Sequence, residues 1–156
     1  MFSTIFKHEV NYWFKKPAFY IYLSIFFVVS LFFAAASAGF FDGLVVSVGG
    51  NKIVNSPLGV HGMFNGMAQL IFFLFPSIIG VTIFRDYKSE MHSILYSYPF
   101  TKSSYLFAKF LSGLLIVSII VLSVGLGVII GFRLPGTNSE IIETFNFSSY
   151  LYTYLV

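Results

Sequence analysis

Three long windows without a charged residue constrain the fold of this chain more than any other feature. They cover residues 17–41, 62–84 and 110–132, and contain 25, 23 and 23 residues. A helix that crosses a bilayer needs about 20 predominantly apolar residues, and core helices of soluble proteins are rarely so uniformly apolar. The sequence therefore predicts three transmembrane helices, over about 18–41, 63–84 and 108–132.

The composition excludes most soluble classes. Only 10% of the residues are charged and 57% are hydrophobic, whereas a soluble domain carries roughly 25% charged residues. The chain has no cysteine, which removes disulfides, thiolate metal sites and cysteine nucleophiles. Its net charge of +3 is scattered along the sequence, so we do not expect it to bind nucleic acid.

A fourth apolar run begins near Phe145 and continues to Val156. Tyr150, Tyr152 and Tyr154 fit an aromatic belt where a helix enters the membrane. We expect this run, about 145–156, to start a fourth span, and the sequence to be a fragment of a longer protein. The predicted fold class is all-α: residues 1–156 form one transmembrane domain, a polytopic helix bundle.

The distribution of lysine and arginine predicts the orientation of the spans. The segment before the first span and the segment between the second and third contain seven of these residues, and the other two segments contain two. Basic residues concentrate on the cytoplasmic side, so we expect a cytoplasmic N-terminus. A cleaved signal peptide ending at Ala36-Ser37-Ala38 is an alternative, but the apolar run 18–33 is longer than the usual 7–15 residues.

The N-terminal segment has the pattern of an amphipathic helix over residues 3–16. Phe6, Val10 and Trp13 recur at i, i+4 and i+7, Phe14 lies beside them, and Pro17 ends the helix. A basic amphipathic helix with a tryptophan at the boundary is typical of a helix that lies along lipid headgroups. The alternative is a cytoplasmic extension of the first span.

A second amphipathic helix is predicted over residues 86–98, on the cytoplasmic side between the second and third spans. Its apolar face must be covered by headgroups, by the bundle itself or by a partner protein. The residues that we expect to contact a partner are Tyr87, Glu90, Met91, Ile94, Leu95, Tyr98 and Pro99.

Small residues recur every four positions in two of the predicted spans. Such faces let helix backbones approach closely in a membrane. Pro76, in the middle of the second span, removes a backbone hydrogen bond and predicts a kink, which could act as a hinge. The predicted packing faces are Ser30, Ala34 and Ala38 in the first span and Ser123, Gly127 and Gly131 in the third.

The sequence contains no motif for catalysis. We find no HExxH, no GxxxxGK[ST] and no serine in a glycine-rich elbow, so we expect no enzymatic activity, no metal site and no ATP site in this chain. The charge-free windows also contain none of the ionisable residues that proton- or ion-driven carriers keep at membrane depth.

The region after the second window resembles the permease subunits of type-2 ABC exporters. That family often reads RD, then LLSTP, a tyrosine and GK over this stretch, and Ala108 here replaces the family's glycine before lysine. The positions that match are Arg85, Asp86, Leu95, Pro99, Tyr105 and Lys109.

The resemblance implies a permease subunit in the bacterial inner membrane, in contact with lipid. It implies a second permease copy and cytoplasmic ATPase subunits that bind the ATP, so that the chain itself needs no cofactor. Helix 86–98 would be the coupling helix that contacts the ATPase. The alternatives are a membrane scaffold without transport activity, and the membrane anchor of a larger enzyme such as a fused zinc aminopeptidase-like domain.

Overall fold

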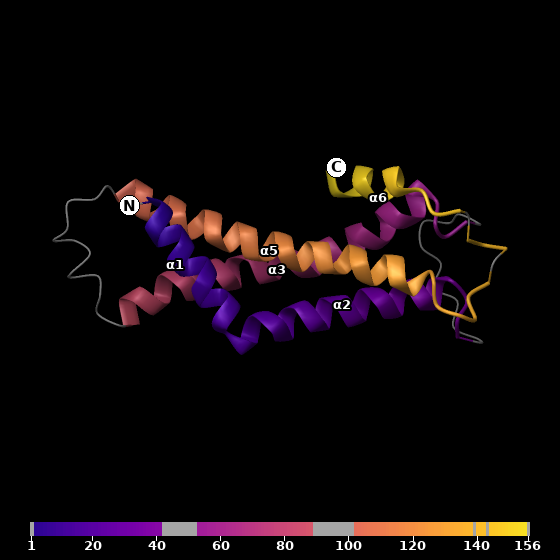
Figure 1. Cartoon of the computed structure of the whole chain (residues 1–156), viewed down its shortest axis with the longest axis horizontal. Helices are drawn as coiled ribbons and strands as arrows, with labels where there is room; N and C mark the ends of the chain where they lie inside the picture. The colour runs from indigo at the N-terminus through magenta and orange to yellow at the C-terminus, as the bar shows by residue number, and fades with distance from the viewer. Residues whose placement is uncertain (1, 42–52, 89–101, 139, 143, 156) are drawn as a thin grey trace. The chain divides into compact units, whose positions relative to one another are not determined.

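The computed structural model describes the chain except for residues 1, 42–52, 89–101, 139, 143 and 156. The residues that it describes form helices and connecting segments and no strand, which confirms the all-α membrane fold class. The helices are α1 (Phe2–Lys15), α2 (Pro17–Ser37), α3 (Pro57–Lys88), α5 (Lys102–Gly131) and α6 (Phe147–Leu155) (Figure 1).

Three of these helices are long and apolar enough to cross a membrane. The candidate spans are Pro17–Ser37, Pro57–Asp86 and Ser103–Gly131, with 21, 30 and 29 residues. About 20 residues suffice to cross the hydrocarbon core, so the chain is a multi-pass membrane protein whose helices contact lipid. The helix α6 begins within the predicted fourth apolar run and has nine residues.

The helix ends follow from local chemistry. Pro17 is the first residue of α2, where a missing N–H costs nothing. Ser56 caps α3, because its hydroxyl accepts a hydrogen bond from the backbone N of Gly59 at 3.2 Å. The helix α2 ends at Ser37, before the predicted residue 41, because Gly39 turns the chain with a φ of 75°.

The helices divide into two compact units. Unit 1 contains residues 1–21 and 71–119, and unit 2 contains residues 22–70 and 120–156. In unit 1, α1 and the adjoining parts of α3 and α5 surround a core. This core includes Trp13, Phe19, Ile78, Ala108 and Ile116.

In unit 2, α2 packs against α5 through small residues. A Cβ atom at Gly127 would lie 2.1 Å from Ser30 Oγ and 2.7 Å from the carbonyl oxygen of Phe27. One at Gly131 would lie 2.6 Å from Ala34 Cβ. Only glycine permits the two backbones to approach this closely. The structure thus places the two predicted packing faces against each other, with Ala38 and Ser123 also buried.

Within unit 2, the segments that connect the helices are joined by backbone hydrogen bonds. The N–H of Asn138 donates to the carbonyl of Ala38 at 2.9 Å, and that of Val54 donates to Ile141 at 3.0 Å. The buried hydroxyl of Tyr150 on α6 donates to Asn55 Oδ1 at 2.6 Å. These contacts connect α6 to the segment that precedes α3.

Candidate functional site

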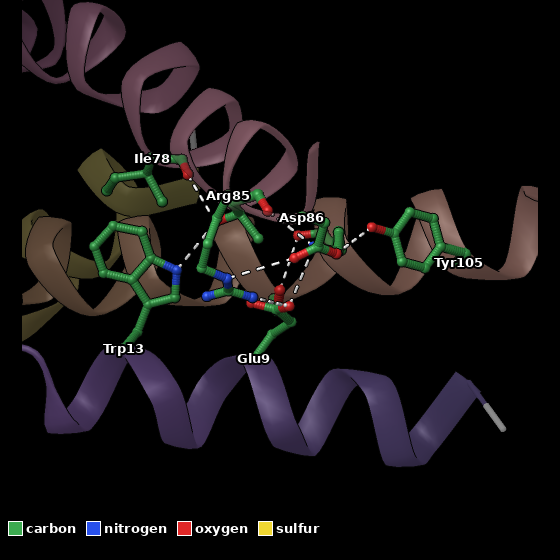
Figure 2. Close-up of polar contacts among 9 residues, drawn as sticks. Glu9, Trp13, Ile78, Arg85, Asp86 and Tyr105 are labelled. Carbon is green, nitrogen blue, oxygen red and sulfur yellow. Dashed lines mark hydrogen bonds and ion pairs between the residues drawn. The ribbon is translucent and has the colours of Figure 1, made fainter. Parts of the chain in front are cut away.

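The polar residues of unit 1 meet where α1 crosses α3 and α5. Glu9 lies in the middle of α1, Arg85 and Asp86 lie in the last turn of α3, and Lys109 lies near the start of α5. Figure 2 shows Glu9 and Trp13 pointing from α1 toward the charged end of α3. We call Glu9, Arg85, Asp86 and Lys109 the ion cluster.

The ion cluster contains two carboxylates and two cations in direct contact. Arg85 Nη2 donates to Glu9 Oε1 at 2.6 Å, and Arg85 Nε lies 3.5 Å from Asp86 Oδ1. Lys109 Nζ lies 2.5 Å from Asp86 Oδ2 and 3.3 Å from Glu9 Oε1. Each cation therefore contacts both carboxylates, and the four charges cancel.

Lys109 is the centre of the ion cluster and is almost completely buried. Its side chain is 1% exposed, and that of Glu9 is 4% exposed. Besides the carboxylates, the Lys109 ammonium donates to the carbonyl oxygen of Thr82 at 2.8 Å. A buried ammonium is tolerated only when its charge and donors are matched, as they are here.

Tyrosine and tryptophan side chains surround the ion cluster. The Tyr105 hydroxyl, on α5, donates a hydrogen bond to Asp86 Oδ2 (Figure 2). Trp13 Nε1 donates to Thr82 Oγ1 at 3.2 Å, which joins α1 to α3 a second time. The Arg85 guanidinium lies 4.0 Å from the centre of the Tyr12 ring, a distance typical of a cation–π contact.

Tyr12 lies in α1, outside the spans, between two cations. Lys16 Nζ is 4.5 Å from the Tyr12 ring centre. The positive charges of Lys16 and then Arg85 lower the pKa of Tyr12 below its usual value, although burial opposes the change. Two cations, Lys16 and Arg85, therefore contact the Tyr12 ring at this end of unit 1.

The ion cluster has a specific mechanical consequence. Asp86 lies in the last turn of α3, Lys109 lies near the start of α5, and residues 89–101 lie between the two helices in the sequence. The Lys109–Asp86 ion pair and the Tyr105–Asp86 hydrogen bond tie both ends of this connection to each other. Glu9 accepts from both cations and so ties α1 to the same point.

Most residues predicted to contact a partner lie outside the described part of the chain. Glu90, Met91, Ile94, Leu95, Tyr98 and Pro99 all fall within residues 89–101. The backbone of Tyr87 belongs to α3. The predicted helix 86–98 and its partner contacts stay predictions.

The predicted interfacial helix corresponds to α1, but its apolar row faces protein. Trp13 is buried, Phe6 and Val10 are half-buried, and Phe14 is exposed. The helix α3 continues through Pro76, whose ring is on its exposed side. The role of Pro76 as a hinge stays a prediction.

The sequence reasoning did not identify Glu9 and Thr82 as parts of a site. A signal was present for Glu9, which is the only acidic residue in the first 41 positions. It also falls in the helical row of Phe2, Phe6 and Trp13. A charge in an otherwise apolar row indicates a buried ionic partner.

No protein-family model matches this chain, and no curated protein or solved structure gives a significant match. The fold and the candidate spans themselves define its class, a multi-pass α-helical membrane protein.

Proposed function

We propose that this chain belongs to the membrane-spanning permease subunit of an ATP-driven ABC exporter. In this proposal a cytoplasmic ATPase subunit binds the connection between α3 and α5. A second permease copy completes the pathway, and ATP is bound only by the partner. The charged end of unit 1 lies in the cytoplasm of a bacterium, in agreement with the excess of lysine and arginine there.

The observation that carries this proposal is the Lys109–Asp86 ion pair, at 2.5 Å. A force on residues 89–101 can move α3 and α5 together only if the end of α3 and the start of α5 stay in contact with each other. Because the ion cluster joins those ends to each other and to α1, such a force acts on α3, α5 and α1 together. This arrangement suits a transmission element between an ATPase and a membrane bundle.

A ligand drives such a motion only by binding one state better than the other. The ATPase pair closes on ATP, and the connection between α3 and α5 follows it in this mechanism. The role of the ion cluster is to keep the helix ends together during the movement. Pro76 lies about 14 Å along α3 from Arg85, at 1.5 Å per residue, and is the hinge that we propose.

The double variant Ile94→Asp/Leu95→Asp tests the proposal. We expect it to lose the nucleotide-binding ATPase that co-purifies with the wild-type protein from native membranes, and to lose ATP hydrolysis in reconstituted vesicles. Ser93→Asp/Ser97→Asp adds the same charge to the other face of the predicted helix, and should retain both. Unchanged co-purification of the ATPase with the first variant would contradict the proposal.

The same experiment separates the scaffold alternative. A scaffold would also lose a cytoplasmic protein on Ile94→Asp/Leu95→Asp substitution, but the lost protein would bind no nucleotide. Loss of a nucleotide-binding subunit together with ATP hydrolysis therefore favours transport over a scaffold.

A further inference from the structure

The outward face of α1 carries lysine side chains that form no ion pair with an acidic residue in the described part of the chain. Lys7, Asn11 and Lys15 are exposed, each two residues from the buried Glu9 or Trp13. Two residues correspond to about 200° around an α-helix, so the exposed row lies opposite the ion cluster. We call Thr4, Lys7, His8, Asn11 and Lys15 the α1 stripe.

The charge of the α1 stripe is not neutralised within the described part of the chain. Glu9, the acidic residue of α1, is buried and paired with Arg85 and Lys109. No ion pair joins Lys7 or Lys15 to a described acidic residue. The stripe therefore offers ammonium, amide and hydroxyl donors over about 16 Å of helix, at 1.5 Å per residue from Thr4 to Lys15.

The position of α1 identifies what faces this stripe. Lys15 ends α1, and Pro17 begins the first candidate span. Lys15 thus lies where a membrane helix leaves the hydrocarbon, at the level of the lipid headgroups. Phe14 is 38% exposed beside it, and aromatic residues are enriched at this interface.

We propose that the α1 stripe binds the phosphate groups of anionic phospholipids. The sequence pattern predicts that α1 lies along the lipid headgroups, but Trp13 of its apolar row hydrogen-bonds Thr82 inside unit 1, so the contact with lipid is assigned to the stripe on the other side of the helix. Binding to lipid through the stripe is therefore electrostatic and salt-sensitive. This inference requires only that the chain spans a membrane, and does not depend on an ATPase partner.

The test uses the purified full-length protein in a neutral detergent. Short-chain phosphatidylglycerol is titrated, and phosphatidylcholine with the same acyl chains and inorganic phosphate serve as comparisons. Native mass spectrometry counts the lipids that the protein retains at each lipid concentration. We expect the wild type to bind phosphatidylglycerol at least about tenfold more tightly than phosphatidylcholine, with an affinity that falls as salt rises.

The variant Lys7→Gln/Lys15→Gln should lose about thirty-fold in affinity for phosphatidylglycerol, which corresponds to about 1 kcal/mol for each lysine near an anionic surface. Lys52→Gln/Lys88→Gln removes the same charge elsewhere and should bind as the wild type does. Lys7→Arg/Lys15→Arg should restore binding, which guards against a folding defect in the glutamine variant.

Four results would overturn the proposal. Two of them are equal affinity of the wild type for the two lipids, and an equal loss of affinity in the Lys52→Gln/Lys88→Gln control. Another is competition by inorganic phosphate as strong as that by lipid, which indicates a site for free phosphate. The last is that Lys7→Gln/Lys15→Gln loses a co-purifying protein while its affinity for phosphatidylglycerol stays unchanged. That result would assign the stripe to protein binding.

Discussion

The two units of this chain hold their helices together by opposite means. In unit 1, four charged side chains meet between α1, α3 and α5, with Lys109 at their centre. In unit 2, α2 and α5 approach so closely at Gly127 that no larger side chain fits. One contact depends on matched charges, and the other on the absence of side-chain atoms.

The two kinds of contact respond differently to change. A close contact between small residues gains many weak dispersion interactions and has one favourable geometry. A buried ion cluster is held by strong attraction that must offset a large desolvation cost, so its net contribution depends on every partner being present. Unit 2 is therefore suited to a fixed contact, and the ion cluster of unit 1 to one whose stability can be altered from outside.

The largest effect is expected at the ion cluster. Lys109→Met keeps most of the side-chain volume but removes one of the two cations that Glu9 and Asp86 share, and Lys109 is the more deeply buried of the two. Removing one partner of a buried ion pair typically costs about 3–5 kcal/mol. We expect a loss of this size in the unfolding free energy measured in mixed micelles.

Lys88→Met is the matched control, because Lys88 ends the same charged turn of α3 but is exposed. It should change the unfolding free energy by less than about 0.5 kcal/mol. Equal losses in the two variants would mean that the ion cluster does not stabilise unit 1, and the contrast between the units would disappear.

The sequence revealed the packing faces of unit 2 more readily than the ion cluster of unit 1. Ser123, Gly127 and Gly131 form a periodic pattern within one helix, and such a pattern is visible without knowing the partner. The cluster unites Glu9 with Arg85, 76 positions away. Periodicity within a helix indicates which face is buried, but not which residues of other helices meet that face.

The sequence also predicted which segments form membrane helices. It did not predict the residues at which those helices begin and end, because these depend on local geometry. The charge-free windows located α2, α3 and α5 because hydrocarbon tolerates few charges. They did not show that α3 extends from Pro57 to Lys88, since polar residues can continue a helix beyond the membrane. Nor did they show that the apolar row of α1 faces protein, because lipid and a protein core both select apolar side chains.

The second largest effect is expected at the contact between α2 and α5. Gly127→Ala places a methyl group 2.7 Å from the carbonyl oxygen of Phe27, a backbone atom that cannot rotate away. Overpacking of this kind costs about 1–3 kcal/mol. Thermal unfolding of the purified variant in detergent should show the loss.

Gly113→Ala, in unit 1, is the matched substitution. Its new methyl group would lie 2.9 Å from Cγ1 of Ile79, and this side chain can adopt another rotamer. We expect a smaller loss than at Gly127, below about 1 kcal/mol. If Gly113→Ala proved as harmful as Gly127→Ala, close backbone contact would not distinguish unit 2 from unit 1.

The smallest effect, and one of opposite sign, is expected at Gly66 on α3. A methyl group there would meet no atom within 4 Å, and the same holds for Gly80 in the unit 1 part of this helix. Alanine stabilises a helix interior relative to glycine by up to about 1 kcal/mol, so Gly66→Ala and Gly80→Ala should each raise the thermal midpoint slightly. A loss at Gly66 but not at Gly80 would show that the exposed face of α3 in unit 2 is covered in the assembled protein. Unit 2 would then contain a second contact, besides the one between α2 and α5, that leaves no room for a side chain larger than glycine's.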